Sequence, residues 1–357
     1  MSGPNISDVL GKRINRDGPI SVAKYMEAVA KAYYAEGTAF GKDGDFVTAP
    51  EVSQIFGELI GIWCVTAWQA LGQPRNFNLV ECGPGRGTLI ADALRAIKDI
   101  APSFLDSASV HLVERSQSLR AQQKERLTIY NAKWHNDFST IPNGKVIIIG
   151  NEFLDALPTR QFQKTNLGWC ERLVDYKHKE FSYCLDPNPT NIIDETYNDA
   201  CLGSIIEYSE AVEDIIKQMA QLCLDDRGVS LMIDYGHIQS GIGETLQALK
   251  HHSYHPILKE PGTADITAHV DFALVAQAAR SMGVETWGPL EQGLWLRRIG
   301  VNIRQTQLCA GKSTEDAKAI RSGVRRLVEP DAMGSLFKVI AFAPPGIGPL
   351  AGFKVES

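Results

Sequence analysis

Short apolar runs alternate with stretches of helical spacing along most of the chain, and this pattern predicts an α/β protein. Lys145–Gly150 is an almost continuous run of branched apolar residues, which is typical of a central strand in a parallel sheet. Leu89, Ala93 and Ile97 recur at helical spacing after another such run, so a helix follows it. Further strands are expected from residue 77 and over residues 110–114, 229–234, 284–287 and 336–342, and another should end at residues 134–138.

The N-terminal part of the chain is predicted to be helical. Ser21 can cap a helix that occupies residues 20–36. Thr48 and Glu51 have the spacing of a capping box, and Pro50 suits the first turn of the helix they introduce. That second helix, to about residue 71, is apolar nearly all round, so it should be buried or cover a partner. Residues 1–75 are therefore expected to form an N-terminal helical cap or lid.

The middle of the chain interrupts this organisation. Residues 160–185 alternate between apolar and polar positions with turn signals between the runs, which predicts an antiparallel insertion at about 160–200. Asp186–Thr190 contains two prolines and is expected to be a loop. Helices are expected over residues 205–224 and 305–327. The main domain would then span residues 76–345, followed by a tail at 346–357.

A glycine-rich turn follows the strand that starts at Phe77. It reads Glu81-Cys82-Gly83-Pro84-Gly85-Arg86-Gly87-Thr88, and its glycines permit positive φ and close approach of a ligand. The helix start offers unpaired N–H groups to a carboxylate or phosphate. The phosphate-binding turn of a dinucleotide fold has the pattern Gly-x-Gly-x-x-Gly. In this chain Thr88 occupies the position of the third glycine. The acidic residue and three alternating glycines resemble instead motif I of class I S-adenosylmethionine-dependent methyltransferases.

Carboxylates at the ends of two further strands are candidates for nucleoside contacts. Glu114 closes the next strand, near the expected interval of ~20 residues, where an acid would hold a ribose diol. The alternative is an exposed strand-end glutamate. Asp137 would end a third strand and could reach an adenine amino group, with Trp134 or Phe138 stacked on the ring. A turn-forming Asn-Asp pair explains Asp137 nearly as well.

The central strand ends in Asn151-Glu152-Phe153-Leu154-Asp155, and ligands of open α/β sheets bind outside such strand ends. Glu152 and Asp155 are therefore the first candidates for holding a methyl acceptor, with Asn151 in reach of cofactor or acceptor. Asp155 could instead cap a helix, and Glu152 could be a surface carboxylate. His237, His269 and Asp271 could accept a released proton, although Asp271 is equally suited to cap the following helix.

Composition narrows the class of protein. The 357 residues carry a net charge of −6, which argues against a general nucleic-acid surface. Seven scattered cysteines without a Cys-x-x-Cys favour reduced thiols, and His251 and His255 alone do not make a metal site, so no metal is expected. No apolar stretch reaches transmembrane length, and Met1–Pro19 carries no targeting signal. A cytoplasmic, bacterial protein is expected, of unknown oligomeric state.

Several stretches in order along the chain resemble the mitochondrial dysfunction protein A (MidA) family. They are Gly44–Gln54 with Phe56–Glu58, Glu81–Leu89, Asn151–Pro158, Asp234–Gly236, and Pro261-Gly262 with Asp265–Phe272. The resemblance implies a class I S-adenosylmethionine-dependent methyltransferase: a Rossmann-like α/β fold with a seven-stranded, mostly parallel sheet. Mitochondrial matrix members of this family are protein arginine methyltransferases that act on a complex I subunit during assembly.

Carried over to this chain, the resemblance implies S-adenosyl-L-methionine as cofactor. The loop of Glu81, Gly83, Pro84, Gly85 and Gly87 would bind it, and Glu114 would hold the ribose. The Gly44–Gln54 segment, with Thr48, Pro50 and Gln54, would fold over it. Paired hydrogen bonds from Glu152 and Asp155 would hold an acceptor guanidinium. Two alternatives stay open: a small-molecule or RNA methyltransferase, and a non-catalytic assembly factor that keeps the cofactor fold.

Overall fold

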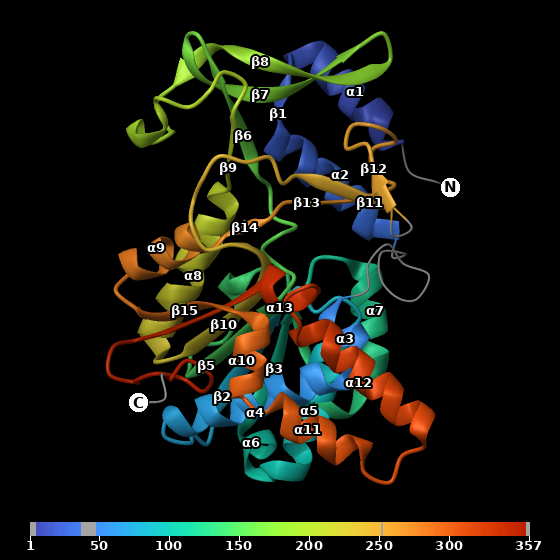
Figure 1. Cartoon of the computed structure of the whole chain (residues 1–357), viewed down its shortest axis with the longest axis vertical. Coiled ribbons are helices and arrows are strands. Elements are labelled where there is room, and N and C mark those ends of the chain that lie inside the picture. Colours follow the sequence, from blue (N-terminus) through green and yellow to red (C-terminus); the bar gives the residue numbers. More distant parts are fainter. Residues whose placement is uncertain (1–4, 37–47, 251–252, 355–357) are drawn as a thin grey trace. The chain divides into compact units, whose positions relative to one another are not determined.

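The computed structural model describes residues 5–36, 48–250 and 253–354 (Figure 1). The chain divides into two compact units. The first comprises Met1–Phe46, Asp155–Glu213 and Ser240–His269, and the second comprises Val47–Leu154, Asp214–Gln239 and Val270–Ser357. The Gly44–Val47 part of the family motif lies outside the described residues. Each unit is described by itself.

The second unit is built on a mixed sheet that has eight strands within the described residues. Seven follow one path in the order β15-β16-β10-β5-β2-β3-β4, and β14 pairs with the end of β10. Their bounds are β2 Phe77–Cys82, β3 Ala108–Val113, β4 Lys133–His135, β5 Val146–Asn151, β10 Val229–His237, β14 Val270–Asp271, β15 Glu285–Glu291 and β16 Phe337–Ala343.

The strands β10, β5, β2, β3 and β4 run parallel, whereas β16 lies antiparallel between β10 and β15, so β15 runs in the same direction as these five. The α/β class is thereby confirmed, as is the central position of the β-branched run that became β5. Because parallel strands end at one edge, the turns after β2, β3 and β5 lie along the same edge of the sheet.

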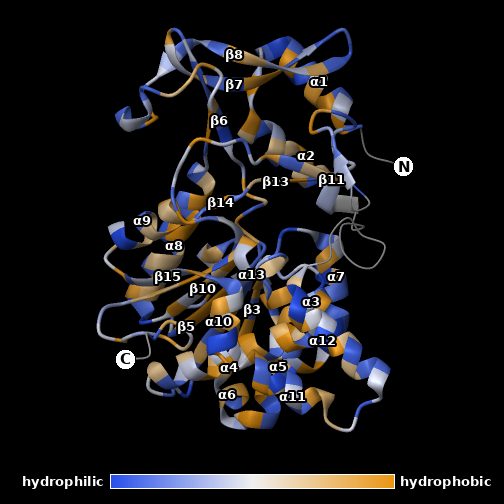
Figure 2. Ribbon diagram, viewed as in Figure 1, coloured by the Kyte–Doolittle hydropathy of each residue, from blue (hydrophilic) through white to orange (hydrophobic). Residues whose placement is uncertain are grey.

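Helices cover this sheet, as in other open α/β sheets. They are α3 Ala49–Val52, α4 Gln54–Ala70, α5 Thr88–Ile100, α6 Pro102–Ser107, α7 Gln117–Arg126, α9 Phe272–Ser281, α10 Gln292–Arg298, α11 Val301–Cys309, α12 Thr314–Val328 and α13 Met333–Leu336. The 3-10 turns are η1 Thr128–Tyr130 and η2 Phe138–Thr140. The predicted burial of α4 is confirmed: Ile55, Phe56 and Trp63 are fully buried in one cluster with strand residues Ile147 and Ile149. In Figure 2 much of the α4 ribbon has the colour of hydrophobic residues.

The first unit combines two helices with two small sheets. The helices are α1 Ile6–Asp17 and α2 Val22–Glu36, and α8 Glu210–Asp226 begins within this unit. One sheet follows β1-β7-β6-β9 with β8 paired to β7, and the other is β12-β11-β13. The remaining bounds are β1 Ile20–Ser21, β6 Arg160–Thr165, β7 Gly168–Lys177, β8 Glu180–Thr190, η3 Glu195–Tyr197, β9 Ile205–Tyr208, β11 Gln247–Lys250, β12 Ser253–His255 and β13 Asp265–Thr267. The antiparallel insertion is confirmed.

Two predictions in this insertion are wrong. Asp186–Thr190 is not a loop, because β8 continues to Thr190 and pairs Pro189 with Cys170 after a register shift. Within the described residues β8 pairs with β7 alone, and an edge strand tolerates prolines since one row of its N–H groups needs no partner. The helix expected from Ile205 starts later, at Glu210, because residues 205–208 form β9 against β6.

Two helix boundaries also differ from expectation. The helix predicted over 305–327 is two helices, α11 and α12, separated by Gly311 at positive φ and restarted by Ser313, whose side chain caps Asp316 N–H. The helix predicted from Ile20 starts at Val22, since Ile20 pairs with Val174 as part of β1. Ser21 caps it as expected, accepting from the N–H of Lys24.

Candidate functional site

The glycine turn after β2 has the backbone that its sequence predicts. Gly83, Gly85 and Gly87 all have positive φ, at 59°, 53° and 74°. Gly83 N–H donates to the carbonyl of Val113 at 3.0 Å, and Gly87 N–H donates back to Pro84 at 2.7 Å. A Cβ on Gly83 would meet the Phe153 ring at 2.8 Å, so this position also requires glycine for space.

Glu81 is the second-last residue of β2, just before this turn, and is almost completely buried. Burial raises the pKa of its carboxyl to about 8, although a hydrogen bond from the backbone of Ile90 acts in the opposite direction. Among the described residues, its Oε2 meets no hydrogen-bond donor. A buried carboxylate oxygen without a donor is costly to maintain, so Glu81 suits a cationic or N–H-bearing ligand group.

Glu114 follows β3 directly and is half-buried rather than an exposed strand-end residue. Its Oε1 accepts a 2.7 Å hydrogen bond from the N–H of Ser116, and Oε2 lies 3.4 Å from the amide nitrogen of Gln123. Burial raises the pKa of Glu114, while these hydrogen bonds favour its charged form. The carboxylate is therefore held in a fixed orientation at the edge where β2 and β3 end.

Asp137 forms the turn that the alternative interpretation required. Its Oδ1 accepts from the N–H of Ser139 at 2.9 Å and from the Ser139 hydroxyl, and these bonds lower its pKa. Phe138 is buried, whereas Trp134 is partly exposed and has the Lys124 ammonium 5.4 Å from its ring centroid. A contact of Asp137 with adenine stays a prediction.

The turn after β5 places Glu152 in a strained backbone conformation. Its φ is 51°, a region that residues with a branched or long side chain rarely occupy. Its Oε1 accepts from the side-chain amide of Asn151 at 3.0 Å and from the N–H of Ala49 at 3.1 Å. Such strain persists only where surrounding contacts enforce it, and it is often found at functional sites.

Asp234 on β10 enforces this turn. It is buried, and its Oδ2 accepts from the N–H groups of Phe153 and Leu154 at 3.1 and 2.9 Å. Asp234 belongs to the Asp234–Gly236 stretch that resembles the family, but its sequence position alone predicted no role for it. Its only local signal was an acid at the end of an apolar strand.

The predicted capping box of Thr48 and Glu51 does not form, because these side chains do not make the hydrogen bonds that it requires. Thr48 precedes α3 without a side-chain cap, and the Glu51 carboxylate instead accepts a 2.6 Å hydrogen bond from the Thr88 hydroxyl. Arg86 lies 3.9 Å from the same carboxylate. Pro50 occupies the first turn of α3 as expected. The short helix α3 is therefore attached to the glycine turn, and its closure over a ligand stays a prediction.

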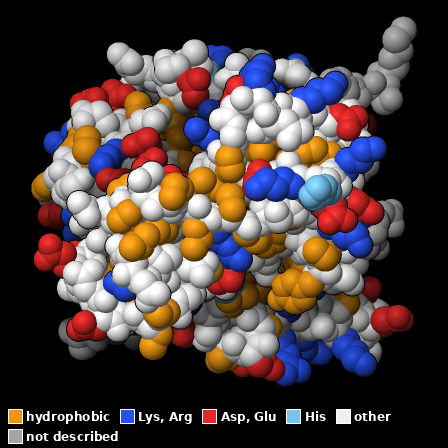
Figure 3. All heavy atoms as spheres, turned by 90° about the horizontal axis from the view of Figure 1, so that it is seen from above, with side chains coloured by type: hydrophobic (Ala, Val, Ile, Leu, Met, Phe, Trp, Pro, Cys, Tyr) orange, Lys and Arg blue, Asp and Glu red, His pale blue; other side chains and the backbone are white. Residues whose placement is uncertain are grey.

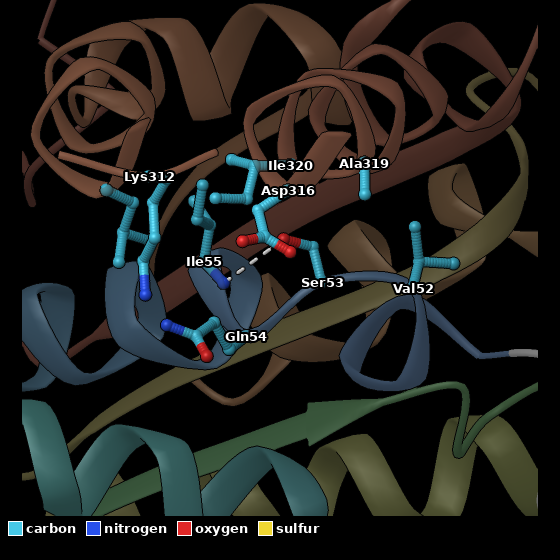
Figure 4. A pocket seen from close by; sticks show the side chains of 9 residues that line it. Val52, Ser53, Gln54, Ile55, Lys312, Asp316, Ala319 and Ile320 are labelled. Carbon is cyan, nitrogen blue, oxygen red and sulfur yellow. Dashed lines mark hydrogen bonds between the residues drawn. The ribbon is translucent and has the colours of Figure 1, made fainter. Parts of the chain in front are cut away.

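Gln54 begins the next helix and contacts a buried carboxylate. Its amide donates to Glu58 at 3.2 Å, and Glu58 also binds Arg95 at 3.0 Å and Arg304 at 2.7 Å. Gln54 further lines a pocket of about 430 Å³ with Val52, Ser53, Ile55, Leu308, Lys312, Asp316, Ala319 and Ile320. Figure 4 shows Lys312 near Gln54, and Asp316 beside Ser53. A cofactor contact of Gln54 stays a prediction.

The remaining catalytic candidates are divided between the two units. In the first unit, Asp155 is buried and its carbonyl accepts from Ala268, while His269 N–H donates to Thr245 at 2.9 Å. In the second unit, Asp271 caps α9 as predicted, accepting from the N–H groups of Ala273 and Leu274.

His237, the last residue of β10, is paired with Asp271 on β14. Its Nε2 lies 3.9 Å from Asp271 Oδ2, and parallel pairing of β10 with β14 sets the two residues side by side. The imidazole is more than one-third exposed and therefore in contact with water.

Within residues 5–36, 48–250 and 253–354, no group of three or more His, Cys, Asp or Glu is placed to hold a metal ion. His251 lies outside the described residues, and His255 contacts the carbonyl of Lys259. No described helix is long and apolar enough to cross a membrane. On the face shown in Figure 3, acidic and basic side chains are interspersed.

The arrangement of glycine turn, buried acid and strand-end carboxylate matches a known class. The family model for S-adenosyl-L-methionine-dependent methyltransferases (Methyltransf_28) matches residues 59–290. The chain belongs to this family, which confirms the expected resemblance, and its cofactor is S-adenosyl-L-methionine.

Individual relatives extend the similarity over nearly the whole chain. The protein arginine methyltransferase NDUFAF7 homolog, mitochondrial, of Drosophila melanogaster is 36% identical over 95% of this chain and 85% of its own. The human mitochondrial protein arginine methyltransferase NDUFAF7 is 34% identical over 93% of this chain and 82% of its own. A COG1565 superfamily member from Burkholderia thailandensis, bound to S-adenosyl-homocysteine, has a TM-score of 0.82 at 27% identity, covering 99% of this chain and 96% of its own.

The residues around the turn fit this cofactor. The three positive-φ glycines leave the backbone open to a ligand, and the partnerless oxygen of Glu81 suits its ammonium group. The fixed carboxylate of Glu114 suits the hydroxyls of its ribose.

Proposed function

We propose that this enzyme is a protein arginine methyltransferase whose acceptor is a subunit of a respiratory complex. The observation that carries the proposal is Glu152: a glutamate kept at positive φ beside the cofactor turn, with one oxygen fixed by Asn151 and Ala49. A carboxylate held in this way can form charge-assisted hydrogen bonds with a guanidinium. The names of the fly and human relatives support the same acceptor class.

Each part of the second unit has a proposed role. The turn of Gly83, Pro84, Gly85 and Gly87, with Glu81, binds the amino-acid portion of the cofactor, and Glu114 binds its ribose. Asp137 contacts the adenine. Asn151 orients Glu152, and α3, with Thr48 and Pro50, closes over the ligand. We propose further that ligands bind at the carboxyl ends of the parallel strands, as in other open α/β sheets. A cap formed by residues 1–75 stays a prediction, and α4 within this range belongs to the core of the second unit.

When bound, the cofactor supplies an activated methyl group on sulfur. The contribution of the chain is to align acceptor nitrogen and methyl carbon at about 3–3.5 Å and to exclude water. Glu152 would also localise electron density on the nitrogen that attacks. His237 with Asp271 can receive the proton that this nitrogen releases. Roles for Asp155 and His269 stay predictions, and so does a cytoplasmic location.

The test compares methylation in cells that contain the wild-type gene, no gene, or the Gly85→Val variant. Valine at a φ of +53° distorts the cofactor turn. Mass spectrometry of respiratory-complex subunits should show arginine methylation with the wild type alone. Label from the methyl donor that appears in RNA or small molecules would favour another acceptor. Full complementation by Gly85→Val would favour an assembly factor that works without catalysis.

A further inference from the structure

Gln123 joins three parts of the cofactor side of the sheet. It lies on α7 and its side chain is completely buried. Its Nε2 donates to the carbonyl of Gly85 at 2.6 Å and lies 3.4 Å from Oε2 of Glu114. Its Oε1 accepts from the indole N–H of Trp134 at 2.8 Å.

This orientation of the amide is fixed by chemistry. An indole N–H can only donate and a backbone carbonyl can only accept, so flipping the amide would break both short contacts. A Cβ on Gly87 would lie 3.5 Å from Cγ of Gln123, so the side chain packs against the far end of the same turn. One buried residue therefore sets the spacing between the glycine turn, the carboxylate of Glu114 and the indole of Trp134.

We propose that Gln123 is the positioning residue that gives the site its preference for a ribonucleoside donor. By fixing Glu114 relative to Gly85, it places the carboxylate to accept from the ribose hydroxyls. By holding Trp134 Nε1, it fixes one wall of the base site. The inference rests on the cofactor placement given above and is independent of the methyl acceptor.

Removal of the amide leaves buried groups without partners. In Gln123→Met the shape is nearly kept, but the Gly85 carbonyl and the Trp134 N–H both lose their hydrogen bond. Glu114 then keeps the hydrogen bond from the N–H of Ser116 but loses the contact of its Oε2 with Gln123, so its carboxylate is held less firmly. We therefore expect weaker binding of the nucleoside, and above all a loss of discrimination between ribose and deoxyribose.

The test is calorimetric titration of the full chain with S-adenosylhomocysteine and with its 2′-deoxy analogue, without any acceptor. We expect Gln123→Met to weaken S-adenosylhomocysteine binding about tenfold or more, and to bring the ratio of the two Kd values close to one. Gln122→Met, at the neighbouring and partly exposed position of α7, should keep the wild-type Kd values and ratio. In the Glu114→Gln background, Gln123→Met should change the ratio little further.

A second variant covers the case in which Gln123→Met does not fold. Gln123→Glu keeps the acceptor for Trp134 but replaces the donor toward Gly85 and Glu114, and should also lose the discrimination. A wild-type ratio in either folded variant would overturn the proposal. A ratio of one in the wild type would overturn the ribose role of Glu114, whereas an absence of arginine methylation would refute only the proposed acceptor.

Discussion

The backbone N–H of Ala49 donates a 3.1 Å hydrogen bond to Oε1 of Glu152. Ala49 is the first residue of α3, and Glu51 on the same short helix accepts from Thr88 at 2.6 Å. α3 is thus bonded both to the turn after β5 and to the helix start after β2. A displacement of α3 would disturb the proposed acceptor clamp and the cofactor turn together.

Glu152→Gln separates the charge of this side chain from its structural role. The glutamine oxygen can still accept from Ala49, so α3 should stay attached. Loss of the carboxylate should slow methyl transfer to an arginine substrate by about 100-fold, by analogy with other charge-stabilising groups. Steady-state kinetics measure the rate of methyl transfer, and titration with S-adenosylhomocysteine shows whether cofactor binding is kept.

The control for this variant is Glu285→Gln, an exposed acid at the start of β15, which should behave as the wild type. If Glu152→Gln transfers methyl groups and binds cofactor at wild-type levels, Glu152 does not hold the acceptor.

Thr88→Val tests the attachment of α3 to the cofactor turn. The substitution removes the hydroxyl that donates to Glu51 and leaves a partly buried carboxylate short of one donor. We expect a cost of about 1 kcal/mol in unfolding free energy and a several-fold rise in the KM for the cofactor. Glu51→Ala combined with Thr88→Val should show non-additive effects in a double-mutant cycle, because alanine removes the acceptor.

Thr314→Val is the matched control, because Thr314 is also the first residue of a helix but is exposed. Additive effects of the Glu51 and Thr88 substitutions would show that the hydrogen bond does not couple α3 to the turn.

Glu81 should make stability depend on pH. Its pKa rises from 4.5 to about 8 on burial, so the folded chain holds a proton that the unfolded chain releases between these values. The stability contribution of Glu81 is therefore fully present below pH 4.5 and is lost as pH rises to about 8. The Glu81→Gln variant should have about the same unfolding free energy as the wild type near pH 4.5. At pH 9 it should be more stable than the wild type by up to roughly 4 kcal/mol.

Urea unfolding of both proteins across this range measures the difference. A cationic cofactor group beside Glu81 would favour its charged form, so binding near pH 7 should release a proton from the wild type and not from Glu81→Gln. Calorimetry in buffers of different ionisation enthalpy detects that proton. A pH-independent stability difference without proton release would contradict the assignment.

Glu58→Gln should affect stability rather than catalysis. Glu58 is fully buried and binds Arg95 and Arg304, which join α4 to α5 and α11. Breaking a fully buried pair costs 3–5 kcal/mol, but both arginines are partly exposed, so about 2 kcal/mol is expected. Thermal or urea unfolding measures this loss.

Asp92→Asn is the control, because it removes the other carboxylate of Arg95 at a more exposed position and should cost less than about 1 kcal/mol. A larger loss of unfolding free energy for Asp92→Asn than for Glu58→Gln would contradict this ranking.

Features with a local cause were predictable from the sequence. The branched run at 145–150 became β5, the glycines became a positive-φ turn, and Asp271 capped α9, because each depends on neighbouring residues alone. The spacing of Thr48 and Glu51 misled for the opposite reason: Glu51 binds Thr88, 37 residues away in sequence.

Contacts that depend on tertiary structure left no trace in the local pattern. Gln123 sits in the polar helix α7, and nothing nearby in sequence distinguishes it from Gln122; its burial follows from the approach of α7 to Gly85. The strand at Ile205–Tyr208 exists because β6 is there to pair with it. The positive φ of Glu152 similarly depends on Asp234, far along the chain, which binds the following N–H groups.

The position of β16 between β10 and β15 has a consequence for biosynthesis. Translation delivers β5 and β10 long before Phe337–Ala343, so the nascent sheet presents an open strand edge while α9 to α13 are still being made. Chaperones that recognise extended apolar segments should therefore engage the emerging chain at Leu231–Ile233, and release it once the ribosome has supplied the last strand.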